Sequence, residues 1–335
     1  MASPTTAITR FDMSLSYAEF SQMAQQRKMI GLKALPPVGV ALQSSDFLKL
    51  TIGSVANKPE DDKRAEGGSY TRKDFEFTKD SYSTDDHGVE ETLDDRRIKR
   101  WASVIRAERV HARRAISRAL NAFEANAAAA VFNTTTWSGA LTNTVAGVWT
   151  SQANALPIAD IDAAIEVVAN RIGMRPNTLI LTWSDWRFLT RTDEISALLK
   201  YSGQDDPKSL GSIAQLKELW DLDSILIGDG YKVTSDDGAA TTTLGNYWTA
   251  GTAMVAHINP MSAADIEDPM PSIGYTVMWN EENASIPGDD SPTPPIIFEE
   301  YREEARRGSA LRARLDYQHK IVHAEAGQLL TGIQT

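Results

Sequence analysis

The sequence of 335 residues predicts an α+β fold built around one long amphipathic helix, and three observations support this. Residues 94–132 contain no Gly or Pro, and their apolar residues recur at helical spacing. Residues 157–269 alternate helix and strand patterns, as an α/β unit does. From about Pro269 the chain becomes strand-like again and supplies a sheet that can cover the long helix. The α/β unit is therefore predicted to be an insertion between the helix and its sheet.

The composition is typical of a globular protein, with 42% hydrophobic and 24% charged residues. Because cysteine is absent, disulfides, thiolate metal sites and a cysteine nucleophile are excluded. The N-terminal MASPTTAITRFDMS lacks the apolar core of a signal peptide, and no apolar run approaches the ~20 residues that cross a bilayer. We therefore expect a protein of the cytoplasm, or of something assembled there, with no membrane partner.

The helix predicted at residues 94–132 would be roughly 55–60 Å long at ~1.5 Å per residue. Its apolar residues lie on one face: Ile98, Trp101, Ile105, Ala112, Ile116, Ala119 and Phe123. Between Arg96 and Arg118 it also carries nine basic residues and one acidic residue, Glu108, although the whole chain has a net charge of −11. Eight of the nine lie away from the apolar face and form the candidate site: Lys99, Arg106, Arg109 and Arg113 on one side, with Arg96, Arg100, Arg114 and Arg118 adjacent.

Two interpretations of this basic face stay open at the level of sequence. It can be a solvated helix face whose arginines pair with acidic neighbours. It can also contact phosphates or another acidic partner, because arginines on a helix neutralise backbone charge in a salt-dependent way. Aromatic residues for base stacking are not interleaved with the arginines, so we expect no recognition of single strands or of base sequence.

Residues 59–93 predict a two-stranded excursion with few aliphatic side chains. Phe75 and Phe77 share one strand face, and a second extended piece, Val89 to Leu93, follows the turn-like Asp85-Asp86-His87-Gly88. An isolated hairpin of this kind is at best marginally stable in water. It therefore needs a partner surface, which is either its own domain or something outside the subunit.

The other elements are expected in the second half of the chain and near its end. In the α/β unit, helices are predicted at residues 157–172, 184–190, 194–201 and 212–222, and strands at residues 178–182, 224–228 and 247–258. The first of these helices closes at Gly173, its expected C-terminal cap. The returning strands are predicted at residues 273–279, 296–305 and 311–324.

No motif for catalysis or for a metal emerges from the sequence. Neither G-x-x-x-x-G-K-[ST] nor G-x-G-x-x-G is present. His319 and His323 are four residues apart, but their local pattern is a strand and no third ligand is evident. Asp160 and Asp162 lie in the first turn of a predicted helix, where carboxylates interact favourably with the helix dipole. We therefore expect no catalytic residue, no metal and no cofactor.

The order of these pieces resembles the major capsid proteins of tailed bacteriophages, which have the Hong Kong 97-type capsid fold. The extended loop carries Gly-Gly-x-Tyr-x-x-x-x-Phe at Gly67 to Phe75, and four further stretches look like parts of phage capsid subunits. These stretches are AAAAVFNTTTW (127–137), PIADIDAAIEVV (157–168), RPNTLILTWSDWRFL (175–189) and LDSILIGDG (222–230). The resemblance covers about residues 35–330. No single motif is diagnostic, but the combination is fairly specific.

The resemblance implies a division of the chain into four parts. Residues 1–58 would be an N-terminal arm and residues 59–93 an extended loop that reaches over a neighbouring subunit. Residues 94–156 and 270–335 would form a peripheral domain with the long helix as its spine, and residues 157–269 an axial domain at capsomer centres. The loop residues expected to contact the neighbour are Tyr70, Arg72, Phe75, Phe77 and Tyr82.

The resemblance also implies a structural protein and not an enzyme. Its subunits would assemble as hexamers and pentamers into an icosahedral head around phage double-stranded DNA, in the host bacterial cytoplasm, and would end in the virion. A separate scaffolding protein is expected because no long charged helical extension precedes the arm, and a portal and decoration proteins are further expected partners. The basic face would look inward and contact DNA nonspecifically. Two alternatives stay open, namely an encapsulin-like compartment shell and an α/β enzyme with its site in residues 157–269.

Overall fold

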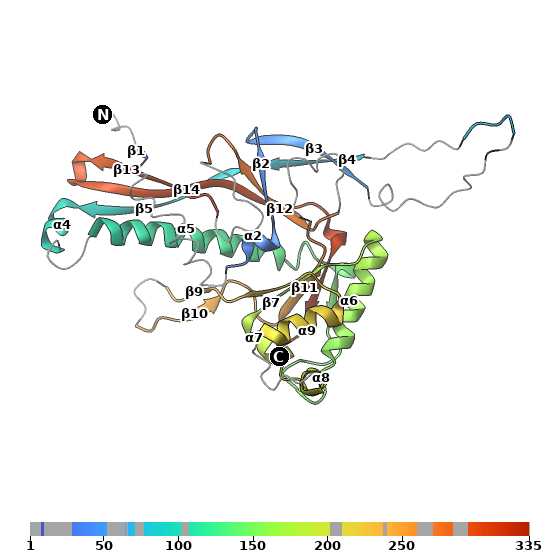
Figure 1. Ribbon diagram of the computed structural model, residues 1–335. Helices are drawn as coiled ribbons and strands as arrows, with labels where there is room; N and C mark the ends of the chain where they lie inside the picture. Colours follow the sequence, from blue (N-terminus) through green and yellow to red (C-terminus); the bar gives the residue numbers. More distant parts are fainter. Residues whose placement is uncertain are drawn as a thin grey trace.

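A computed structural model describes residues 8–9, 29–51, 64, 66–70, 77–101, 107–201, 210–236, 240–259, 271–283 and 294–334. Arg72, Phe75 and Arg106 lie outside the described residues. Two large sheets with their helices lie one above the other in Figure 1, and the described residues also form two two-stranded sheets.

The first half of the chain supplies β1 (Ile8–Thr9), α2 (Gly31–Ala34), β2 (Pro37–Val40), β3 (Ser44–Leu50), β4 (Phe77–Ser83), β5 (Asp85–Asp94), α4 (Asp95–Trp101), α5 (Ala107–Val131), η1 (Gly139–Leu141) and β6 (Thr142–Thr144). The α/β unit follows with α6 (Pro157–Ile172), β7 (Thr178–Thr182), α7 (Trp183–Leu189), α8 (Asp193–Tyr201), α9 (Leu210–Trp220), β8 (Ser224–Gly228), β9 (Tyr231–Val233), β10 (Leu244–Asn246) and β11 (Thr252–Ala256). The last elements are β12 (Gly274–Trp279), β13 (Ile297–Glu303), η3 (Glu304–Arg306), β14 (Gly308–Ile321), η4 (Ala324–Ala326) and β15 (Gly327–Thr331).

The larger sheet covers the long helix α5 and is built around the fourteen-residue strand β14. The strands run in the order β1-β13-β14-β12-β2, and β5 pairs with the other edge of β14. Alternate residues of β14, from Leu311 to Tyr317, turn their apolar side chains toward the helix, where they meet Ile116 and Phe123 in one core. The C-terminal strands therefore cover the helix, as the sequence predicted.

The long helix is confirmed on both sides of a short gap in the description. α4 and α5 are helical, whereas residues 102–106 between them lie outside the described part of the chain. Of the predicted apolar face, Ala112, Ile116, Ala119 and Phe123 are each at most 3% exposed. The 3.6-residue period therefore identified the buried face correctly.

The smaller sheet belongs to the α/β unit and has the order β6-β15-β11-β7-β8. The predicted helix at residues 157–172 and the strands at residues 178–182 and 224–228 are confirmed within their bounds. Gly173 ends α6 with φ 73°, the left-handed conformation that suits a glycine cap. Two strands join this sheet from outside residues 157–269, since β6 and β15 hydrogen-bond to each other and β15 pairs with β11.

The predicted pairing within residues 59–93 is wrong. β4 pairs with β3, from Ser44↔Ser83 to Leu50↔Phe77, while β5 pairs with β14 over ten residues. The reason is that β5 has a core face of its own, because Glu91 and Leu93 are buried against α5 and β14. Residues 85–94 are thus a strand of the larger sheet.

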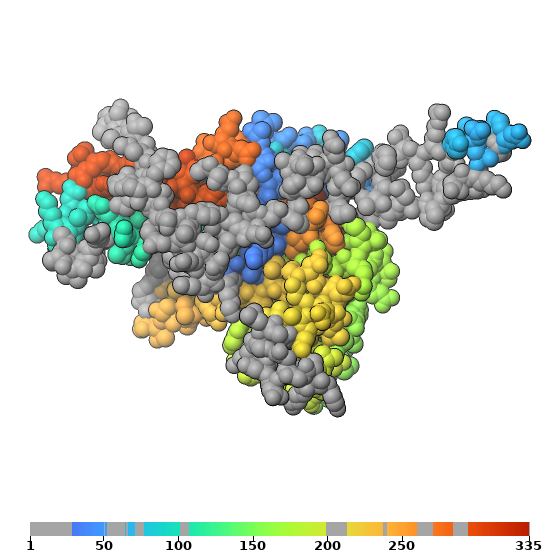
Figure 2. All heavy atoms as spheres, in the orientation of Figure 1, coloured from blue at the N-terminus to red at the C-terminus, as the bar shows by residue number. Residues whose placement is uncertain are grey.

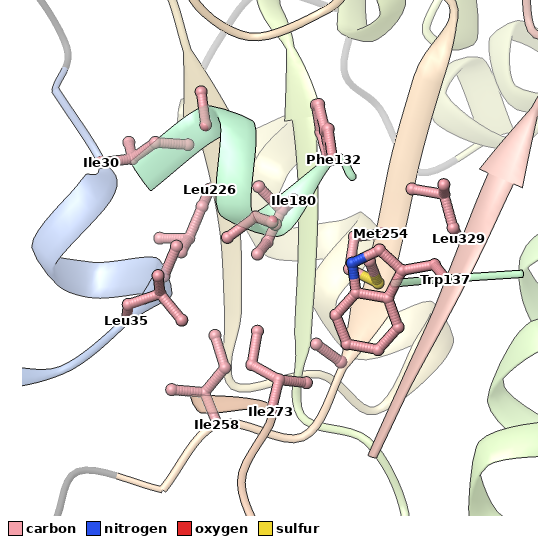
Figure 3. Close-up of a cluster of buried hydrophobic side chains, with 14 of the residues drawn as sticks. Ile30, Leu35, Phe132, Trp137, Ile180, Leu226, Met254, Ile258, Ile273 and Leu329 are labelled. Atoms are coloured by element: carbon pink, nitrogen blue, oxygen red, sulfur yellow. The ribbon is translucent and has the colours of Figure 1, made fainter. Parts of the chain in front are cut away.

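A third cluster of apolar side chains joins the two units (Figure 3). Ile30 and Leu35 enter it from the segment around α2, and Phe132 enters it from the end of α5. Ile180 and Met254 come from the smaller sheet. The long helix and the α/β unit therefore share one continuous core contact.

Candidate functional site

The predicted basic face is exposed wherever the structure describes it. Seven of its eight residues belong to α4 or α5 and have exposed side chains: Arg96, Lys99, Arg100, Arg109, Arg113, Arg114 and Arg118. The eighth, Arg106, lies outside the described residues. The helix and its sheet bury the opposite side of α5, so the arginines project away from the core.

Part of this face is neutralised by an acid that the sequence did not single out. The carboxylate of Glu91 on β5 lies 2.9 Å from Arg118 Nη1 and 3.7 Å from Arg114 Nη2, and its second oxygen lies 3.6 Å from His111 Nδ1. Glu91 is 9% exposed, so its charge is held close to the two arginines. Arg114 and Arg118 therefore bind the sheet, in agreement with the solvated ion-pair interpretation for these two residues.

The other end of the face has fewer salt bridges within the subunit. Arg96, Lys99, Arg100 and Arg109 have no salt-bridge partner among the residues that the structure describes. On the far side of the larger sheet, by contrast, arginines are paired within the subunit. Arg314 Nε lies 3.0 Å from Glu299, and Arg312 Nη2 lies 2.6 Å from Glu90. Among the described residues, positive charge without a salt bridge thus remains at Arg96, Arg100 and Arg109, while Lys99 interacts with the charge of Asp95.

The extended-loop residues stand apart from both cores. Tyr70 is 67% exposed, with the Arg64 guanidinium 5.0 Å from the centre of its ring, and Phe77 is 56% exposed. Tyr82 is half-buried, with its ring 6.4 Å from that of Phe47 on β3. Figure 2 shows the described loop segment, residues 66–70, at one end of the molecule and away from the two sheets. Among the described residues, these aromatic side chains belong to none of the buried apolar clusters.

The ribbon of β3 and β4 is held to the body of the subunit by charged groups. Asp80 Oδ1 lies 2.8 Å from Lys320 Nζ on β14, and Asp80 Oδ2 lies 4.0 Å from Lys49 Nζ. Lys49 also donates a hydrogen bond to the carbonyl of Val322. Burial alone would raise the pKa of Asp80. The hydrogen bond from Lys320, the hydrogen bond from Ser81 N and the charges of the two lysines together have the larger effect, so the pKa of Asp80 is lowered. The carboxylate form is therefore the one that anchors the ribbon.

A second acid that the sequence analysis missed, Glu124 on α5, connects three separate parts of the chain. One of its oxygens accepts hydrogen bonds of 2.8 Å from the backbone N–H of Ile30 and from Trp248 Nε1, and the other accepts one of 2.9 Å from Gly31. The side chain is 2% exposed, and burial raises its pKa. Glu124 thus fixes the segment around α2 and the α/β unit to the long helix.

The acids and histidines considered for chemistry occupy structural positions. Asp160 accepts hydrogen bonds from Ala146 N and Trp149 Nε1. His319 lies between the rings of Phe123 and Tyr317, at 4.8 Å and 4.9 Å, and burial lowers its pKa to about 4. Within the described ranges, no group of three or more His, Asp or Glu side chains is arranged to hold a metal ion.

None of the helices in the described ranges is long and apolar enough to span a membrane. The hydrogen-bonded acids and the ion pairs above are contacts that hold elements together. Among the described residues, Arg96, Arg100 and Arg109 on the long helix and Tyr70 and Phe77 of the extended loop remain exposed.

Comparison with known proteins defines the class of this fold. The chain aligns over 98% of its length with a phage-related protein from Bordetella bronchiseptica (TM-score 0.65, 20% identity, 99% of that chain). It also aligns over 99% of its length with the capsid of Myoviridae phage XM1 (TM-score 0.52, 10% identity, 94% of that chain) and the SrpI encapsulin of Synechococcus elongatus (TM-score 0.52, 8% identity, 93% of that chain). The chain has the Hong Kong 97-type capsid fold.

At the level of sequence, the chain is similar to a particular phage protein. It is 24% identical over 178 residues to the major capsid protein of Burkholderia phage BcepMu. The match covers 53% of this chain and 50% of the phage protein, so the chain spans about half the length of the curated relative that it matches. No model of a known protein family matches the sequence. The resemblance to tailed-phage major capsid proteins is confirmed.

Proposed function

We propose that this chain is a major capsid protein, which assembles as hexamers and pentamers into the icosahedral head of a tailed bacteriophage. The observation that carries the proposal is a capsid fold over 98–99% of the chain, together with sequence similarity to a phage major capsid protein. The exposed aromatic residues of the extended loop also support the proposal, since such side chains need a neighbouring surface. In this role the chain is structural and carries no catalytic site.

The proposed division into parts follows the two sheets. The arm, the extended loop and the peripheral and axial domains keep the limits expected from the sequence, with three adjustments. Residues 85–94 belong with the peripheral sheet, whereas β6 and β15 belong with the axial sheet. The extended loop would then place Tyr70, Arg72, Phe75, Phe77 and Tyr82 against a neighbouring subunit.

The proposed inner surface is the basic end of the long helix, where nonspecific contact with packaged double-stranded DNA would occur. Arg96, Arg100 and Arg109 support this because they have no salt-bridge partner among the described residues, while the chain as a whole has a net charge of −11, and Lys99 lies close enough to Asp95 to share its charge. Arg106 and Arg113 would extend the surface, and Arg114 and Arg118 would contribute less because they share Glu91. A scaffolding protein, a portal and decoration proteins are the further partners of such a shell.

An encapsulin-like compartment is the second candidate, because the SrpI encapsulin has a fold as similar as that of the phage XM1 capsid. The sequence similarity favours the phage head, since the curated match is a phage protein. An enzyme with its site in residues 157–269 has no such support.

Electron microscopy of the purified protein tests the shared part of both candidates. We expect rings, sheets or closed shells, and soluble monomers under all assembly conditions would contradict a shell protein. The contents of shells isolated from the producing cells then separate the two candidates. Nuclease-protected double-stranded DNA supports a phage head, and a packaged protein supports a compartment.

A further inference from the structure

The carboxylate of Glu91 lies beneath the basic face of the long helix. Leu93, two residues further along β5, is buried in the core between the larger sheet and α5, so the side chain of Glu91 points to the same side. The adjacent Glu90 points to the opposite face of the sheet, where it pairs with Arg312. Because β5 pairs with β14 over ten residues, the fold fixes a nearly buried acid under the helix arginines.

The two arginines that contact Glu91 remain open to another anion. Arg118 Nη1 donates one hydrogen bond of 2.9 Å to Glu91 Oε1, and Arg114 Nη2 lies 3.7 Å from the same oxygen, beyond hydrogen-bond distance. The side chains of Arg114 and Arg118 are 63% and 57% exposed. A guanidinium has five N–H donors and binds a phosphate best through two of them. A phosphate arriving from the solvent therefore offers these arginines a better contact than Glu91 does.

A carboxylate that lost both arginines would need another partner, because an unpaired buried charge is costly. His111 on α5 can be that partner. Its Nδ1 lies 3.6 Å from Glu91 Oε2, just beyond hydrogen-bond distance, and has no hydrogen-bond partner among the residues that the structure describes. His111 is 5% exposed, and an imidazole can donate a hydrogen bond from Nδ1 to a carboxylate. A small movement of Glu91 away from Arg118 would complete this bond.

We propose that Glu91 is an internal counter-ion that competes with the phosphates of double-stranded DNA for Arg114 and Arg118, and that His111 receives Glu91 when phosphate takes these arginines. The inference rests on the proposed function, because it assumes that the basic face meets packaged DNA. It adds that the basic face consists of two parts with different availability to phosphate.

The two parts differ in what DNA must displace. Arg96, Arg100 and Arg109, which have no salt bridge among the described residues, exchange only counterions and water for phosphate. Arg114 and Arg118 bind phosphate only as Glu91 leaves them, so part of the binding free energy is spent on this exchange. Glu91 thereby weakens the grip of the subunit on DNA.

Removal of the Glu91 charge tests the competition. E91Q keeps the shape of the side chain but makes both arginines available, so dissociated capsomers should bind random-sequence duplex DNA about tenfold more tightly. The slope of the logarithm of the binding constant against the logarithm of the salt concentration should become steeper by about two. E90Q is the matched control, because it removes the same charge from the same strand but breaks the pair with Arg312 on the opposite face, and DNA binding should not change.

Two further variants trace the gain to the residues named. R114Q/R118Q should cancel the gain of E91Q, and H111L should weaken DNA binding by about threefold in the unaltered chain but have no effect in E91Q, where no charge needs a second partner.

Shells that form from the unaltered chain, while E91Q binds DNA no more tightly than E90Q does, would overturn the competition and leave the proposed function standing. Failure of the unaltered protein to form any ring or shell would overturn the proposed function itself.

Discussion

At the scale of single residues, Glu124 shows how a buried acid can be satisfied without a cation. Three N–H donors from Ile30, Gly31 and Trp248 surround its carboxylate. Gly31 is required there, because a Cβ at this position would lie 2.7 Å from Glu124 Oε2 and 2.9 Å from the Cβ of Ala127. This arrangement was not predictable from the sequence, since an acid on a helix is usually a solvated residue.

Two substitutions of Glu124 should therefore separate the contribution of its hydrogen bonds to stability from that of its side-chain volume. In E124L all three donors lose their acceptor, and each unsatisfied buried donor costs about 1–3 kcal/mol. In E124Q the amide oxygen can still accept from two of them, so the loss should be smaller. Guanidinium titration of the free energy of unfolding measures both variants. Equal stability of E124L and the unaltered chain would contradict the role assigned to this residue.

His319 predicts a dependence of stability on pH. Burial lowers the pKa of His319 to about 4, against an ordinary value of 6.5, so between these values the unfolded chain binds a proton that the folded chain does not. The contribution to stability is therefore complete above about pH 6.5 and is lost as the pH falls toward 4, by up to roughly 3 kcal/mol. Unfolding measured at pH 7 and pH 5 should show a smaller difference in H319Q than in the unaltered chain. An undiminished difference would assign the effect to other groups.

The basic face marks the limit of sequence reasoning at this scale. The helical period correctly predicted that Arg109, Arg114 and Arg118 would be exposed. It could not predict that Glu91 would pair with Arg114 and Arg118. Glu91 is held on β5, and β5 is placed there by its pairing with β14, which lies more than 200 residues later in the sequence. Local periodicity determines which way a helical residue points, while its partner is determined by long-range pairing.

At the scale of elements, features determined by local sequence were predicted correctly, whereas the long-range pairing of strands was not. α6, β7 and β8 were predicted within their bounds because apolar period, cap and length agree locally. The pairing of β4 and β5 was wrong because two neighbouring strands were assumed to pair with each other. Both instead find partners far away, β3 and β14, whose exposed edges the sequence does not reveal.

The anchor of the extended ribbon gives a prediction about local motion. D80N removes the ion pairs with Lys320 and Lys49, so the ribbon of β3 and β4 should detach more often from β14. Hydrogen exchange should become faster in residues 44–50 and 77–83, while global stability changes by less than about 1 kcal/mol, because the three side chains are partly exposed. D46N is the matched control, since the Asp46–Lys79 pair lies within the ribbon and is more exposed. Equal exchange in both variants would contradict the anchoring role.

At the scale of the whole molecule, charge is separated along the subunit. Residues 157–269 contain 17 acidic and eight basic residues, whereas the long helix carries the basic face. Any contact with packaged DNA would therefore be made by the helix side, because the α/β unit would repel phosphates.

Charge reversal on the long helix tests this separation. For nonspecific binding to duplex DNA, the logarithm of the binding constant falls linearly with the logarithm of the salt concentration, and the slope is about 0.9 per phosphate contact. If Arg100 and Arg109 each contact a phosphate, R100E/R109E should lower the slope measured with random-sequence DNA and dissociated capsomers by about two. R191E is the matched control, because Arg191 is exposed in the α/β unit and has no salt bridge among the described residues. If the slope and DNA retention in assembled shells are unchanged in R100E/R109E, the face is only a solvated surface, and the proposed function does not depend on it.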